Sequence, residues 1–139
     1  MRLVLAKISA VFRDNNGSKS IVLGAQWLLD SYCGTDELLQ YVQAAVVVEI
    51  LLGDKAVSDQ MGLGELLANR CAYLIANSHS MRNEILEVFR KIYDVRSKIV
   101  HRGKSQLTKS ERYLFFRLRW ICSRIIQEEV RLIANEKSE

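Results

Sequence analysis

The chain has no proline, and its seven glycines fall mainly between apolar segments. Proline and glycine are the residues that most often interrupt helices, so their scarcity favours long helices over a turn-rich β fold. Every apolar segment follows the helical period, and none alternates cleanly with a period of two. With 139 residues, the chain is long enough to bury its own core. We therefore expect a single all-α domain over residues 1–139, an antiparallel bundle of four to five helices.

Cysteine and histidine are also scarce. The three cysteines are far apart, and only two histidines accompany them, so the spacing matches neither a disulfide framework nor a zinc site. We expect Cys33, Cys71 and Cys122 to be buried reduced thiols of a cytoplasmic protein, with no metal and no other cofactor. His79 lies in a polar turn and is assigned no chemistry, which leaves His101 as the histidine of functional interest.

Long apolar runs are missing as well. The segment Met1–Lys7 starts like a signal peptide, but Lys7 interrupts it and no cleavage site follows. No stretch approaches the roughly 18 apolar residues that span a bilayer, so we expect no membrane partner. Because the chain begins inside an apolar segment, it is also compatible with a domain cut from a longer protein.

Basic residues are concentrated in the second half of the chain. The formal net charge is +4, but residues 1–81 carry a net −2 and residues 82–139 a net +6. Within residues 96–124 nine basic side chains face one acid, Glu111. Such a block attracts polyanions, of which nucleic acid is the commonest in cytoplasm. A solvated helix face is the competing interpretation of the same charges.

Periodicity and capping residues predict where the helices lie. Gly103 is a natural residue to end one helix, and Thr108 with Glu111 forms a capping box that begins the next. Asp14–Ser18 is expected to be a loop that ends in a cap-like serine. We expect helices over residues 1–13 (with a strand as the alternative), 19–32, 37–52, 63–76, 81–101 and 108–134.

One arginine interrupts the apolar stripe of the helix over residues 81–101. Arg96 falls where an apolar residue is expected, in line with Ile85, Phe89, Ile92 and Ile99. A guanidinium on such a face must be paired, face a cleft or reach the edge of the core. Glu49 lies on an equally apolar stripe of the helix over residues 37–52. We predict a contact between the two, with a solvated Glu49 as the alternative.

His101 lies five residues after Arg96 and close to the end of the same helix. An arginine that grips a phosphate and an imidazole that moves a proton are the minimum set for cutting RNA without a metal. Five residues of ideal helix, however, separate the two side chains by about 140°. They converge if the helix unwinds towards Gly103, or if two copies of the motif meet across a symmetric interface. A solvated or capping histidine is the alternative.

The helix over residues 108–134 has two apolar sides. One faces the core, and the other carries Tyr113, Phe116 and Trp120 between two rows of arginines. A monomer would expose these aromatic side chains, so we expect a partner chain or stacked bases to cover them. Packing against the N-terminal helices is the alternative.

The segment Tyr93–Gly103 resembles the C-terminal R-x4-H motif of HEPN domains, most closely their Apea-like branch. The resemblance extends to Glu49 and Leu51–Gly53, and covers roughly residues 40–104, about half of the chain. Two positions differ from the family pattern. Ser97 stands where many nuclease members have Asn, Asp or His, and Arg102 directly follows the histidine.

The resemblance implies a dimerising helical bundle in which two R-x4-H motifs form one cleft, a metal-independent endoribonuclease. Arg96 would bind the scissile phosphate, and His101 would act as general acid or base while the 2′-hydroxyl attacks phosphorus. The residues in supporting roles would be Glu49, Ser97, Asp94 and Tyr93. The RNA-binding residues would be Lys98, Arg102, Lys104, Arg112 and Arg119.

The same resemblance implies a toxin or an antiviral-defence effector. Its partners would be RNA, a second copy of the chain, and an antitoxin or a larger defence-system protein. Two rival functions stay open. The chain could be a non-catalytic module that binds RNA or nucleotide or only dimerises, or a scaffold whose arginine rows dock an acidic protein.

Overall fold

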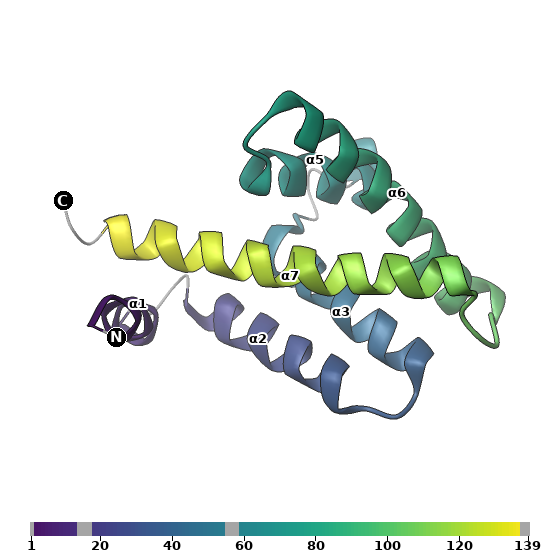
Figure 1. The fold of residues 1–139 in the computed structure, drawn as a ribbon, viewed down its shortest axis with the longest axis horizontal. Helices are drawn as coiled ribbons and strands as arrows, with labels where there is room; N and C mark the ends of the chain where they lie inside the picture. The colour runs from purple at the N-terminus through teal and green to yellow at the C-terminus, as the bar shows by residue number, and fades with distance from the viewer. Residues whose placement is uncertain (1, 14–17, 55–58, 137–139) are drawn as a thin grey trace.

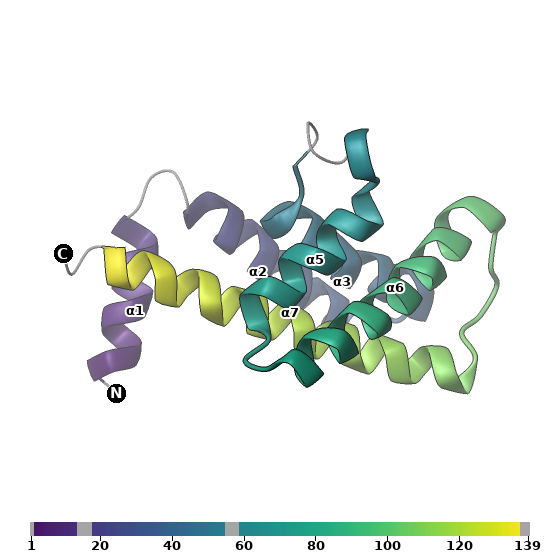
Figure 2. The ribbon, with the colours of Figure 1, turned by 90° about the horizontal axis from the view of Figure 1, so that it is seen from above.

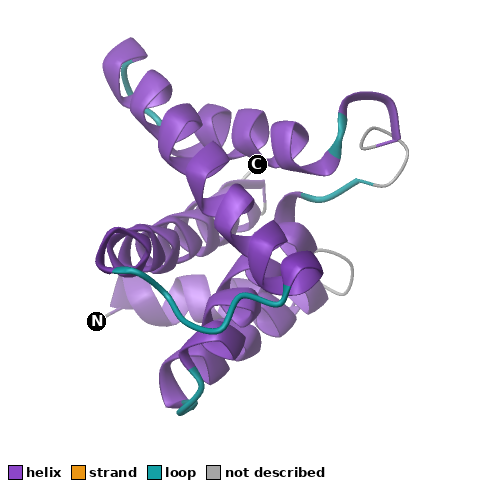
Figure 3. Ribbon diagram, turned by 90° about the vertical axis from the view of Figure 1, so that its right-hand side faces the viewer, coloured by secondary structure: helices purple, strands orange, loops and turns teal. Residues whose placement is uncertain are grey.

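The computed structural model describes residues 2–13, 18–54 and 59–136, and these form helices and loops but no strand (Figures 1 and 3). The all-α prediction is confirmed for this part of the chain. Residues 59–61 are also helical. The helices are α1 (Arg2–Arg13), α2 (Ser18–Cys33), α3 (Glu37–Leu52), α5 (Leu63–Ile75), α6 (His79–Arg102) and α7 (Lys109–Glu136).

The first segment is therefore a helix, not the strand that the sequence left open. Of the loop predicted over residues 14–18, only Ser18 lies among the described residues. α2 begins at Ser18, one residue before the predicted start of this helix, and Ser18 is buried.

Side-chain caps fix where three of the helices begin. The carboxylate of Asp36 accepts hydrogen bonds from the first backbone N–H groups of α3. Ser78 caps α6 in the same way, accepting from Met81 N. His79 is consequently the first residue of α6, and its placement in a turn was wrong, although its side chain is exposed as expected. The capping box of Thr108 and Glu111 is formed at the start of α7.

α7 is the longest helix and touches each of the other five labelled helices. α2 and α3 run in opposite directions beside it, joined by a short connection, while α5 and α6 cover another side (Figures 1 and 2). α1 crosses the C-terminal part of α7 steeply at one end of the molecule (Figures 1 and 2). The connection of residues 103–108, in front in Figure 3, joins α6 to α7 at the other end.

The main core lies between α3, α5, α6 and α7. The predicted stripe of α6 is confirmed, since Ile85, Phe89 and Ile92 are almost completely buried. Tyr41 is fully buried in α3, and its hydroxyl donates to the backbone carbonyl of Ile92 at 2.8 Å. This bond satisfies a polar group that would otherwise be costly to bury, and it joins α3 to α6 near the predicted site.

The prediction of three buried thiols is wrong for one cysteine. Cys71 and Cys122 are buried, and burial raises the pKa of the Cys71 thiol to about 12. Cys33, the last residue of α2, is exposed. The inner position near this helix end is taken by Ser31, which is fully buried and hydrogen-bonds to Leu28 O.

No helix in the described part of the chain combines the length and the apolar character that a bilayer crossing requires.

Candidate functional site around Arg96 and His101

α6 carries the two residues of the R-x4-H motif and stays helical through Arg102. Gly103 follows with φ 61°, the left-handed conformation in which glycine commonly ends a helix. The helix therefore does not unwind before His101. Of the two routes by which Arg96 and His101 could converge, unwinding within one chain is excluded.

The predicted contact between Glu49 and Arg96 is confirmed. Arg96 Nη2 lies 2.9 Å from Glu49 Oε1, so α3 and α6 are joined by an ion pair. The two side chains are 18% and 20% exposed, which leaves a strip of each open to solvent. Arg96 Nε is buried without a hydrogen-bond partner in the described part of the chain. The guanidinium is thus positioned by one carboxylate and is not saturated with acceptors.

Tyr93 completes this arrangement. Its hydroxyl donates to Glu49 Oε1 at 3.4 Å, and the Arg96 guanidinium carbon lies 5.4 Å from the centre of its ring. Burial, followed by the Glu49 carboxylate, raises the pKa of Tyr93. The hydroxyl therefore stays a donor at neutral pH. Tyr93 therefore contacts both members of the ion pair, Glu49 and Arg96.

Gly64, at the start of α5, contributes to the site and was missed by the sequence analysis. A Cβ atom at this position would lie 2.7 Å from Tyr93 Cδ1, which is closer than real Cβ contacts. The ring of Tyr93 therefore packs against bare backbone on one side, and lies 6.3 Å from the ring of Phe89. Spacing within α6 gave no signal for this long-range contact.

The remaining motif residues lie on or near the surface of α6. His101 and Arg102 are exposed in its last turn. Lys98 is partly exposed, and its ammonium lies 2.7 Å from the Asp94 carboxylate one turn earlier. Ser97 is partly buried and makes no hydrogen bond through its side chain in the described part. The chain thus brings together Glu49, Tyr93 and Arg96, and leaves His101 outside that cluster.

Besides Lys98, which pairs with Asp94, three more of the predicted RNA-binding residues are engaged within the chain. Lys104 lies 3.0 Å from Glu111, and Arg112 makes a two-pronged contact with Glu37. Arg119 donates to the carbonyl of Ser31, and its guanidinium stacks between the rings of Tyr32 and Phe115, 4.2 and 4.0 Å from their centres. These contacts give each side chain a structural role in addition to any role with RNA.

The aromatic side of α7 is exposed in the single chain. Tyr113, Phe116 and Trp120 are 58%, 68% and 38% exposed, so packing against the N-terminal helices does not cover them. Arg117 lies between them on the helix, with its guanidinium 5.4 Å from the centre of the Trp120 ring. The same guanidinium pairs with Glu84 of α6 at 2.9 Å. The patch remains available to a partner.

Among the residues described, no group of three histidine, cysteine, aspartate or glutamate side chains is placed to hold a metal ion. Comparison of the chain with protein-family models, with curated protein sequences and with solved structures gave no match.

Proposed function

We propose that the chain is a HEPN-type four- to five-helix bundle that cuts RNA without a metal, at a cleft shared by two copies. The observation that carries the proposal is the contact between Glu49 and Arg96, supported by Tyr93. It holds a guanidinium at the solvent boundary of an otherwise apolar helix face, where the exposed strip can meet a phosphate. No side-chain hydrogen bond, ion pair or ring contact reaches His101 from the described residues, and it stands at the end of the same helix.

In the proposed reaction, the two residues act from opposite copies. Arg96 of one copy neutralises charge on the scissile phosphate, while His101 of the other copy accepts the 2′-hydroxyl proton. The 2′-oxygen attacks phosphorus, the P–O5′ bond breaks, and the 5′-oxygen takes up a proton from solvent. The products are a 2′,3′-cyclic phosphate and a 5′-hydroxyl. Lys98 and Arg102, which remain accessible, would hold the neighbouring phosphates.

The test is cleavage of end-labelled single-stranded RNA in the presence of EDTA. His101→Ala is expected to abolish cleavage without unfolding the chain, because the side chain is exposed. His79→Ala is the matched control, since it removes the other histidine from the opposite end of the same helix. RNA with 2′-O-methyl groups should resist cleavage. Absence of cleavage by the wild type, or cleavage that survives His101→Ala, would falsify the proposal.

The shared cleft has a test of its own. Arg96→Gln and His101→Ala chains should each be inactive, and mixing them should restore part of the activity, because mixed dimers combine one intact residue from each chain. Restoration requires that the two residues come from different copies. If the mixture stays inactive while the separate variants remain folded and dimeric, the residues do not act across the interface.

A second function is favoured by the burial of Arg96. About four-fifths of its side chain is covered and its charge is already paired, which also suits a structural ion pair in a non-catalytic RNA-binding module. In that case RNA binding would weaken steeply with salt and no product would form.

A further inference from the structure

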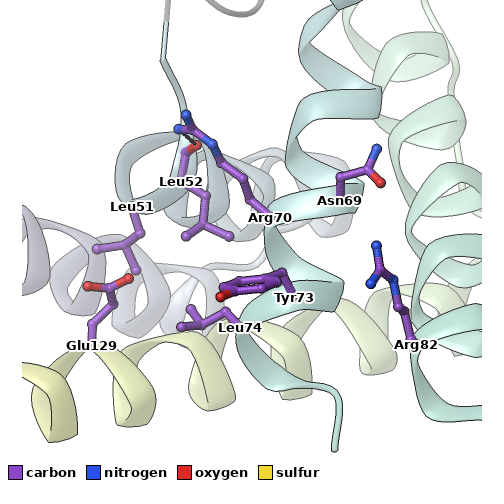
Figure 4. A pocket seen from close by; sticks show the side chains of 8 residues that line it. All are labelled: Leu51, Leu52, Asn69, Arg70, Tyr73, Leu74, Arg82 and Glu129. Atoms are coloured by element: carbon purple, nitrogen blue, oxygen red, sulfur yellow. Dashed lines mark hydrogen bonds between the residues drawn. The ribbon is translucent and has the colours of Figure 1, made fainter. Parts of the chain in front are cut away.

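A cavity of about 450 Å³ opens on a part of the surface to which none of the predicted site residues contributes. It lies between the C-terminal end of α3, one side of α5, the start of α6 and the later part of α7 (Figure 4). Its lining combines leucines, a tyrosine and both signs of charge: Leu51, Leu52, Asn69, Arg70, Tyr73, Leu74, Arg82 and Glu129.

Glu129 supplies the acidic side of this cavity. Its side chain is partly buried beside Leu51 and Leu74, and burial raises its pKa. No hydrogen bond or ion pair reaches its carboxylate from the described residues. A carboxylate that has lost water without gaining a donor is unfavourable, so a ligand that brings a donor would stabilise it.

Tyr73 forms the middle of the cavity. It is 82% exposed, an unusual state for a large aromatic side chain in a folded chain. In Figure 4 its ring lies between Glu129 on one side and Arg82 on the other. An uncovered ring face of this kind binds apolar groups by stacking and ammonium groups by cation–π attraction.

Arg82 supplies the basic side. Its guanidinium has no hydrogen bond or ion pair in the described part of the chain. A second cavity of about 330 Å³ shares Tyr73 and Arg82 with the first and adds Ser78 and His79. Arg70 differs, because it donates to Leu52 O at 2.8 Å and lies 3.6 Å from Asp54. The charge left for a ligand on this side is therefore that of Arg82.

We propose that these two neighbouring cavities, which share Tyr73 and Arg82, bind a short zwitterionic molecule of the peptide type. Its ammonium group pairs with Glu129, its apolar body lies on Tyr73, and its carboxylate pairs with Arg82. Glu129 is partly buried and gains most from a partner, while the exposed Arg82 adds a contact for the opposite charge of the same molecule. This site is independent of the proposed RNA cleavage.

The experiment measures binding of the peptides Ala-Phe, Ala-Phe-Ala and Ala-Phe-Ala-Ala by calorimetry. The length that spans the two charged groups should bind best. Acetylating its amino end or amidating its carboxyl end should each weaken binding roughly tenfold, since each removes a charge-assisted contact. The proposal fails if no peptide binds at millimolar concentration, or if the blocked peptides bind as well as the free ones.

Two variants assign the charges to residues. Glu129→Gln should weaken the free peptide and remove the difference between free and acetylated peptide. Arg82→Gln should likewise weaken binding of the free peptide, and it should remove the difference between the free and the amidated peptide. Glu87→Gln, which alters an exposed carboxylate of α6 outside both cavities, is the control and should change nothing. If the free peptide binds the Glu129 and Arg82 variants as tightly as the wild type, the site lies elsewhere.

Discussion

Arg96 and Glu49 illustrate how one charged pair can join two apolar helix faces. Their side chains are about four-fifths covered, so removing either partner leaves a poorly solvated charge, while removing both leaves none. We expect Arg96→Met and Glu49→Leu each to lower the free energy of unfolding by about 1–3 kcal/mol. The double variant should lose clearly less than the sum. Urea unfolding of the four proteins measures this, and additivity within about 0.5 kcal/mol would contradict it.

Gly64 gives a second prediction at this scale. A methyl group at position 64 would push on the Tyr93 ring at 2.7 Å, so Gly64→Ala should destabilise the chain by about 1–3 kcal/mol despite its better helix propensity. Gly24→Ala in α2 is the matched control. Its new methyl group would make only an ordinary contact of 3.4 Å with Leu51, and the change should be neutral or stabilising. If thermal unfolding gives the same change in stability for both substitutions, the Tyr93 ring can move aside at little cost.

The sequence predicted the contact between Glu49 and Arg96, beside the alternative of a solvated Glu49, because a charge on an apolar helix face demands a partner and both residues lie on such faces. It could not predict the Gly64 contact, since the fit of a ring against bare backbone depends on how two helices pack. Cys33 was misplaced for a related reason. Ser31 is fully buried near the end of α2, whereas Cys33 is exposed. Polarity alone predicts the opposite, because serine is on average more exposed than cysteine.

The helices themselves follow from periodicity and capping residues, and the capping box of α7 can be tested directly. Thr108 Oγ1 accepts from Glu111 N at 3.3 Å, and the Glu111 carboxylate accepts from Thr108 N at 2.7 Å. Thr108→Ala should cost about 1 kcal/mol of stability. Urea unfolding measures the loss, and an unchanged midpoint would show that the first turn of α7 does not depend on its cap.

Glu111 adds a pH dependence to the same element. Burial raises its pKa, but the Thr108 backbone N–H and the Lys104 ammonium lower it by more, so the folded value lies below the usual 4.5. The stabilisation is thus present above pH 4.5 and is lost as the pH falls through the lower folded pKa. Glu111→Gln should be less stable than the wild type at pH 7, and the two should converge in acid, once the pH lies below the folded pKa of Glu111. If the wild type and Glu111→Gln still differ in stability in acid, the difference comes from packing and not from the charge of Glu111.

At the scale of the whole molecule, two apolar surfaces lie at opposite ends. One is the aromatic side of α7, and the other is formed by Leu3, Val4, Leu5 and Ile8 of α1, which are about half exposed or more. The proposed cleft requires two copies to meet near the end that carries His101. We therefore expect Phe116→Glu to reduce self-association and Leu5→Glu to leave it largely intact, as measured by light scattering. The reverse result would place the interface at α1 and separate the two motifs.

The central position of α7 has a consequence for how the protein unfolds. A helix of 28 residues is about 42 Å long, and α7 contacts all five other labelled helices. The pairs α2–α3 and α5–α6 also pack on each other, and α7 contacts both pairs, so loosening α7 would uncover apolar surface on each of them. Amide hydrogens around Leu118–Ile125, at the crowded midpoint, should then exchange with deuterium at the rate of global unfolding, while those of α1 exchange orders of magnitude sooner.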